Sequence, residues 1–109
     1  MQRRLLSLFL AASAAAAITT SAWAQTFPSR PVRIVVPYAA GGGTDIISRQ
    51  LAQKLSEAWN QSVIVENRPG ANGIVGTEVV LKSPPDGHNL VVVVGAHVIN
   101  GSLQKSMPF

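Results

Sequence analysis

Residues 38–45 join a glycine-rich loop to the start of a helix, and this combination can bind an anion. The loop reads YAAGGGTD and follows an apolar run at residues 32–36. Consecutive glycines allow φ > 0 and a close approach of the backbone to a ligand. Thr44 or Asp45 offers an N-cap oxygen to the helix, whose unpaired N–H groups carry positive partial charge. The pattern predicts a binding site for a phosphate or a carboxylate.

The loop lacks the residues of the two commonest phosphate-binding motifs. A Walker A loop has Lys and then Ser or Thr after its last glycine, whereas Gly43 is followed by Thr44 and Asp45. A dinucleotide fingerprint requires a glycine at the position of Ile46, although Glu66 stands where its acidic residue is expected. Asp45 would also repel a phosphate dianion. The residues favour a carboxylate, and they weaken the nucleotide interpretation without excluding it.

The first 24 residues are predicted to be a secretory signal peptide. Arg3 and Arg4 form a basic n-region, residues 5–18 an apolar h-region, and residues 22–24 an A-x-A site with cleavage after Ala24. The remaining residues 25–109 carry seven Lys and Arg against five Asp and Glu, and no cysteine. This composition gives little support to nucleic-acid binding, and it excludes disulfides and cysteine-based metal sites.

Hydrophobic patterning predicts a β-α-β-α-β order and hence an α/β fold with a parallel sheet. The strands are expected at residues 32–36, 63–65 and 90–94, and the helices at residues 45–59 and 74–81. Right-handed crossovers in an open sheet give the strand order 2-1-3. Ligands bind outside the carboxyl ends of such strands, where three loops at residues 38–45, 67–73 and 95–100 would converge.

The first helix is expected to face the sheet with one apolar stripe. Its residues Ile47, Leu51, Leu55 and Trp59 recur every four positions. The helix can end at Asn60, because Asn tolerates the left-handed conformation. Outside this helix, His88 stands next to the turn at residues 83–87. A histidine beside a turn is usually exposed, so His88 is expected to face solvent.

Four segments in this order resemble the periplasmic solute-binding proteins of tripartite tricarboxylate transporters, the Bug family. The segments are residues 27–32 (FPSRPV), 36–45 (VPYAAGGGTD), 65–71 (VENRPGA) and 84–87 (PPDG). The resemblance implies a periplasmic binding protein-like fold of type II with two lobes that close on a small carboxylate. Residues 25–109 would form the N-terminal part of the first lobe, with the second lobe absent. The implied protein is a periplasmic monomer that delivers its solute to membrane transporter subunits, and it uses no cofactor or metal.

The resemblance also implies which residues contact the ligand. Gly42 and Gly43 would donate amides, Thr44 would donate its hydroxyl, and Asp45 would cap the helix and hold water. His97 departs from the small residues that the family often has after strand 3. The expected ligand-binding residues are Tyr38, Ala39, Gly42, Gly43, Thr44, Asp45, Ala96 and His97.

The sequence contains no catalytic motif and no cluster of acidic residues and histidines, so it does not predict an enzyme. The alternatives are a fragment of a nucleotide-binding α/β enzyme with a degenerate glycine loop, and a gene remnant without a function. Because one end of one carboxylate supplies too little free energy for micromolar binding, this part of a lobe is expected to bind solute weakly or not at all.

Overall fold

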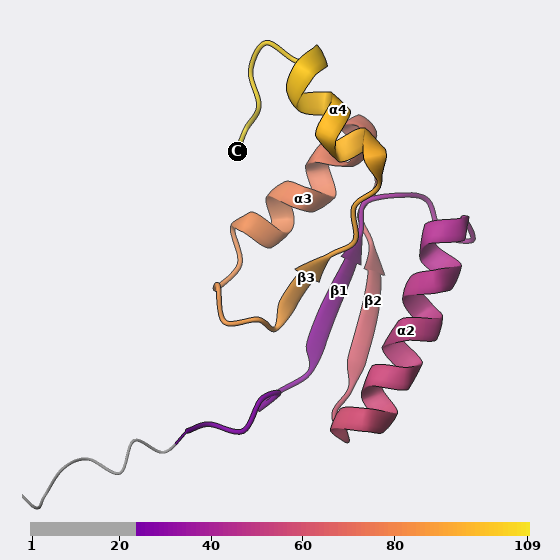
Figure 1. The fold of residues 1–109 in the computed structure, drawn as a ribbon, viewed down its shortest axis with the longest axis vertical. Helices are drawn as coiled ribbons and strands as arrows, with labels where there is room; N and C mark the ends of the chain where they lie inside the picture. Colours follow the sequence, from indigo (N-terminus) through magenta and orange to yellow (C-terminus); the bar gives the residue numbers. More distant parts are fainter. Residues whose placement is uncertain (1–23) are drawn as a thin grey trace, which may run out of the picture.

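The computed structural model describes residues 24–109 and shows a parallel sheet flanked by helices (Figure 1). Nearly all of the predicted signal peptide lies outside the described residues. The elements are β1(Val32–Val36), α2(Gly43–Trp59), β2(Val63–Asn67), η1(Ala71–Gly73), α3(Ile74–Leu81), β3(Asn89–Val91) and α4(Gly95–Leu103). The predicted β-α-β-α-β order is confirmed, and it is extended by a further helix, α4. No helix within the described residues is long and apolar enough to cross a membrane.

The three strands run parallel in the order β2-β1-β3, which confirms the predicted order 2-1-3. In the register of the sheet, Val35 lies opposite Glu66 of β2 and Val91 of β3. Because β1 is central and covered on both faces, Val35 and Val36 are fully buried, with 0% of each residue exposed. Strand β2 extends two residues beyond its predicted end, whereas β3 ends three residues earlier than predicted.

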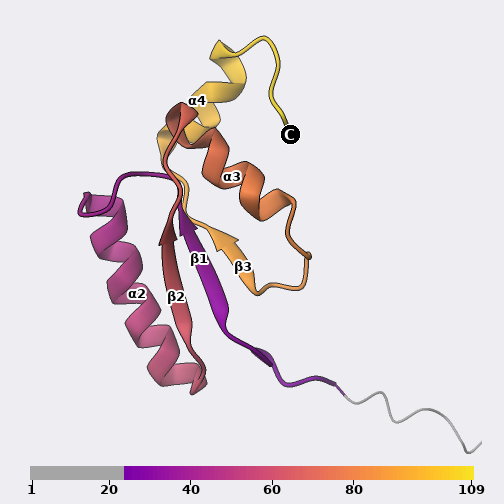
Figure 2. The ribbon, with the colours of Figure 1, turned by 180° about the vertical axis from the view of Figure 1, so that it is seen from behind.

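The helices α2 and α3 cover opposite faces of the sheet. Ile34 and Val36 point to one face and form the buried core with Ala52 of α2. On the other face, Gly76 of α3 lies directly against Pro37, which follows β1. Both views show α2 running beside β2 and α3 running beside β3 (Figures 1 and 2). A right-handed crossover from β1 to β2, followed by one in the opposite direction from β2 to β3, produces this arrangement.

The predicted apolar stripe of α2 is only partly correct. Leu55 packs against the core, but Ile47 and Leu51 are 66% and 47% exposed. The residues that face the sheet most closely are Ser48 and Ala52, which are 1% and 4% exposed. Small side chains let the helix axis approach the strands closely. Hydrophobic periodicity does not reveal a preference for small side chains. The helix ends as predicted at Asn60, which is left-handed with φ 50°.

Candidate functional site

Side chains and backbone from β1, β2 and α3 meet at the carboxyl edge of the sheet. Asn67, the last residue of β2, donates from Nδ2 to the carbonyl of Tyr38 at 3.2 Å and to Oδ1 of Asp45 at 3.0 Å. Gly73, directly before α3, faces the Tyr38 hydroxyl so closely that a Cβ there would lie 3.2 Å from its oxygen. We call residues 38–45, 67–73 and 95–100 together the rim.

The glycine loop enters α2 differently from the prediction. The helix begins at Gly43, and its N-cap is Gly42 in an extended conformation without a side-chain cap. The prediction that Thr44 or Asp45 is the N-cap is therefore wrong. Asp45 is already the third helical residue, and its carboxylate reaches back to accept a hydrogen bond from the amide of Gly41 at 2.9 Å. Of the three glycines, only Gly41 uses a positive φ, +84°.

The carboxylate of Asp45 is buried and fully engaged within the chain. Besides the Gly41 amide, it accepts hydrogen bonds from Nε of Arg49 at 3.1 Å and from Nδ2 of Asn67. These donors, with Arg49 first, lower the pKa of Asp45 to about 2, so the carboxylate is ionised at neutral pH. Only 3% of the residue is exposed. Its side chain braces the loop, and the group that it can offer to a ligand is its amide.

Three amides at the start of α2 remain available to a ligand. Within residues 24–109, the amides of Gly43, Thr44 and Asp45 donate no hydrogen bond to another group of the chain. The first amides of any helix lack intrahelical acceptors and carry positive partial charge. The amide of Gly42 differs, because it contacts the carbonyl of Ala39 at 3.4 Å. Gly43 and Ala39 are exposed, so this end of α2 is open to solvent.

The third segment of the rim is a helix and not the predicted loop. Ala96 and His97 occupy the first turn of α4 and are each half-buried. The backbone amide of His97 donates to the carbonyl of Val94 at 2.9 Å. Its ring stacks on Phe109, with the centroids 5.7 Å apart and the planes 8° from parallel. This stacking gives His97 an intramolecular partner that the sequence did not indicate.

The connection from β2 to α3 contains an uncommon left-handed turn. Four consecutive residues have positive φ, and two of them, Ala71 and Asn72, are not glycine. Such a conformation costs about 1–2 kcal/mol for each residue that carries a Cβ. Asn72 in this turn is hydrogen-bonded to Asn100 of α4. Sequence reasoning missed Asn67, Asn72 and Asn100, although asparagine before Gly or at a strand end is a known signal of backbone bonding.

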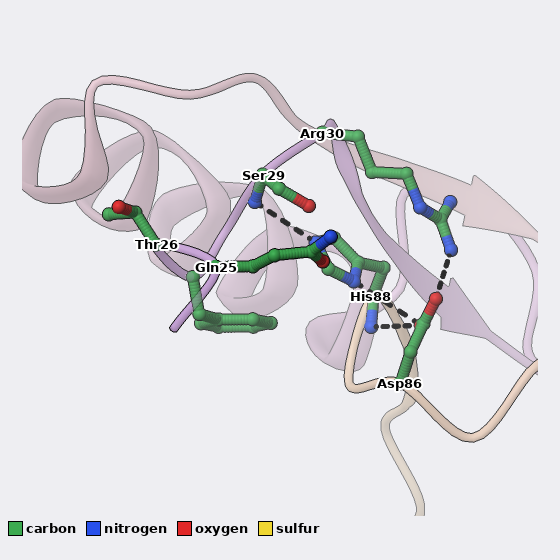
Figure 3. A pocket seen from close by; sticks show the side chains of 7 residues that line it. Gln25, Thr26, Ser29, Arg30, Asp86 and His88 are labelled. Atoms are coloured by element: carbon green, nitrogen blue, oxygen red, sulfur yellow. Dashed lines mark hydrogen bonds and ion pairs between the residues drawn. The ribbon is translucent and has the colours of Figure 1, made fainter. Parts of the chain in front are cut away.

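A separate cavity of about 430 Å³ lies at the opposite, amino end of the strands (Figure 3). Its lining includes Phe27, Ser29 and the ion pair between Arg30 and Asp86. His88 also lines it and is only 6% exposed, so the prediction that it faces solvent is wrong. The reason is that Phe27 covers the imidazole, 4.9 Å between ring centroids, and Ser29 donates its amide to Nε2. This cavity contains none of the rim residues.

The three-stranded parallel sheet, with connecting segments gathered at its carboxyl edge, is an α/β arrangement that solved periplasmic binding proteins share. Residues 47–109 match the tripartite tricarboxylate transporter family receptor. The chain belongs to this family, which confirms the resemblance seen in its sequence motifs. Among the described residues, no group of three or more acidic residues and histidines is placed to hold a metal ion.

Relatives among curated proteins and among solved structures agree with this assignment. Protein BugT of Bordetella pertussis is 37% identical over 108 residues, which cover 97% of this chain and 33% of BugT. The structure of MatC from Rhodopseudomonas palustris with bound malate superposes with a TM-score of 0.70 at 34% identity, covering 76% of this chain and 29% of MatC. R. palustris Rpa4515 with adipate gives a TM-score of 0.60 at 39% identity, covering 62% and 22%. The chain thus spans about a third of the length of the curated relatives that it matches.

Proposed function

We propose that this chain is the N-terminal part of a periplasmic solute-binding receptor that captures a small carboxylate at the glycine loop after β1. The observation that carries the proposal is the set of unused amides of Gly43, Thr44 and Asp45 at the open end of α2. The family assignment supports it, since two similar structures hold the dicarboxylates malate and adipate. In this proposal, residues 1–24 direct export, and membrane transporter subunits receive the solute.

Each of the predicted ligand-binding residues has a proposed part at the site. The amides of Gly43 and Thr44 and the Thr44 hydroxyl donate hydrogen bonds to its oxygens. Tyr38, Ala39 and Gly42 shape the loop beside the carboxylate. From α4, Ala96 and His97 face the rest of the solute. Asp45 contributes its amide, while its carboxylate keeps Gly41 in place.

The free energy available at this rim limits the affinity. A hydrogen bond to a charged group contributes about 1.5–3 kcal/mol, and a helix terminus adds about 0.3–1 kcal/mol. Micromolar binding requires about −8.2 kcal/mol after the costs of association are met. We therefore expect this chain to bind malate or adipate with a Kd of about 1 mM or weaker, and we propose that tight binding needs a second lobe.

The proposal is tested by titrating the ¹⁵N-labelled chain with malate and adipate and following its amide NMR signals. The amides of Gly43, Thr44 and Asp45 should shift at millimolar concentrations, whereas that of Gly87 at the other end of the sheet should not. Succinamide, a neutral diamide, serves as the uncharged control. ATP and NAD test the nucleotide alternative and should leave these amides unchanged. Unmoved amides at tens of millimolar malate and adipate would disprove carboxylate binding at this loop.

The variant Gly43→Pro removes one donor without disturbing the helix. Proline is well tolerated at the first position of a helix, where its missing N–H has no intrahelical acceptor. The preceding Gly42 already has φ −74° and ψ 167°, the conformation that a residue before proline adopts. Loss of one charge-assisted hydrogen bond should weaken binding about tenfold to hundredfold. Gly43→Ala keeps the amide and fits the fold, because no other atom of the chain lies within 4 Å of the added Cβ, so it should bind more tightly than Gly43→Pro.

A further inference from the structure

Two asparagines join the β2–α3 connection to α4 through reciprocal hydrogen bonds. Nδ2 of Asn72 donates to Oδ1 of Asn100 at 2.9 Å, and Nδ2 of Asn100 donates to the carbonyl of Asn72 at 3.0 Å. We propose that this pair is a clamp that positions α4, and with it Ala96 and His97, at the rim. The consequence for the ligand rests on the proposed function, whereas the positioning of α4 does not.

The chemistry of the pair fixes the orientation of both amides. The carbonyl of Asn72 can only accept, so Asn100 must turn its NH₂ group toward it. Oδ1 of Asn100 then faces Asn72, whose side chain must donate. An aspartate at position 72 fits neither orientation of Asn100, because one acceptor would always face another. The pair therefore requires an amide on both sides.

Burial and backbone conformation indicate that the clamp is a structural contact and not an incidental hydrogen bond on the surface. Asn100 is 3% exposed and is the one buried residue of α4. Its partner Asn72 is held at φ 54° and ψ 39°, a conformation that Asn tolerates better than most residues. The turn is closed by a hydrogen bond from the amide of Gly73 to the carbonyl of Gly70 at 3.0 Å. A strained turn persists only where its surroundings determine it, and Asn100 is part of those surroundings.

The position of α4 in the fold makes this contact its principal attachment. Both views place α4 beyond the carboxyl ends of the strands, next to the start of α3 (Figures 1 and 2). Its main packing partner is η1, the turn that contains Asn72. Much of the rest of the helix is exposed, with Val98 at 77% and Leu103 at 75%. A helix with so little apolar burial depends on polar contacts for its placement.

Hydrogen exchange of the ¹⁵N-labelled full chain tests the clamp. Asn100→Ala removes both hydrogen bonds, and protection of the amides at residues 99–103 should fall at least tenfold while protection of β1 is kept. Asn72→Gly keeps the left-handed turn and its carbonyl, so its effect should be smaller. Asn72→Asp should match Asn100→Ala, because neither amide orientation accommodates it. Ser102→Ala, an exposed change on the same helix, should leave protection unchanged.

A second signal reports the position of His97 itself. The stacked ring of Phe109 should shift the ring protons of His97, and Asn100→Ala and Asn72→Asp should move these signals toward random-coil values. Unchanged protection of α4 in Asn100→Ala would overturn the clamp, and so would an equal loss in α4 and β1. If α4 loosens as expected but malate and adipate never shift the parent chain, the clamp stands and the proposed function fails. If the parent binds them and Asn100→Ala binds equally well, the role of the clamp in binding is wrong.

Discussion

Replacing Gly76 by alanine tests how closely α3 approaches the start of the glycine loop. A Cβ at this position would lie 2.5 Å from Cβ of Pro37, and 2.9 Å from both Cα of Pro37 and the carbonyl oxygen of Arg68. Carbon atoms in favourable contact are about 3.5–4.0 Å apart, so α3 would have to move away by about 1 Å. Two of the three obstructing atoms are backbone, and they cannot rotate out of the way.

The magnitude follows from two opposing effects. Overpacking of this kind costs about 1–3 kcal/mol, and the fixed backbone atoms place Gly76→Ala at the upper end. Alanine gains about 1 kcal/mol over glycine in a helix interior. The net loss in the free energy of unfolding should be about 2 kcal/mol. With a urea m-value of about 1 kcal/mol/M for a small protein, the unfolding midpoint should fall by about 2 M.

A matched control is available in α4. Gly101→Ala makes the same chemical change in a helix, but no atom lies within 4 Å of the added Cβ. It should leave stability unchanged or raise it by up to about 1 kcal/mol. Urea denaturation of both variants, followed by far-UV circular dichroism, gives the comparison. If Gly76→Ala is as stable as Gly101→Ala, α3 does not press against Pro37, and the reasoning on the placement of the loop is refuted.

Two further predictions concern the ends of α2. The pKa of Asp45 is lowered to about 2, so the stability that its ionised form provides is present above the unfolded pKa near 4 and is lost as pH falls through about 2. Urea midpoints measured from pH 6 to pH 2 should therefore decline more steeply for the parent than for Asp45→Asn. Because Glu66 and Asp86 titrate in the same way in the parent and in the variant, parallel curves would contradict this prediction. At the other end of α2, Asn60→Val should destabilise the chain by about 1–2 kcal/mol in thermal or urea unfolding, because a β-branched residue is strained at φ 50°. Asn60→Gly should cost no stability. Equal stability of the two variants would argue against the left-handed cap.

The order of the elements and the sheet topology were predictable because each depends on strong local signals. An unbroken apolar run specifies a doubly covered strand such as β1, and right-handed crossovers then leave few topologies. The inward face of α2 was not predictable from periodicity, because α2 has apolar residues on two sides. Contact with the sheet selects Ser48 and Ala52 by their small size, a criterion that depends on the distance between helix and sheet.

The candidate site was predictable in outline and not in detail. The convergence of three segments follows from parallel topology, and the available amide of Gly43 follows from the start of a helix. The engagement of the Asp45 carboxylate depends on Arg49 and on Asn67, which is twenty-two residues away in the sequence. The clamp between Asn72 and Asn100 likewise spans twenty-eight residues. Contacts over such separations leave no periodic trace in one sequence.

Apart from Asp45 and Arg49, the groups that bind the rim segments to one another are uncharged amides. Asn67 donates a hydrogen bond to the Tyr38 carbonyl, and Asn72 and Asn100 are joined by hydrogen bonds between uncharged groups. Dissolved salt screens charges but has little effect on neutral hydrogen bonds. The shape of the rim should thus depend little on ionic strength outside the Asp45–Arg49 ion pair, while its proposed attraction for an anionic solute should weaken as salt is added. If the proposed function holds, salt therefore weakens solute capture more than it alters the surface that captures the solute.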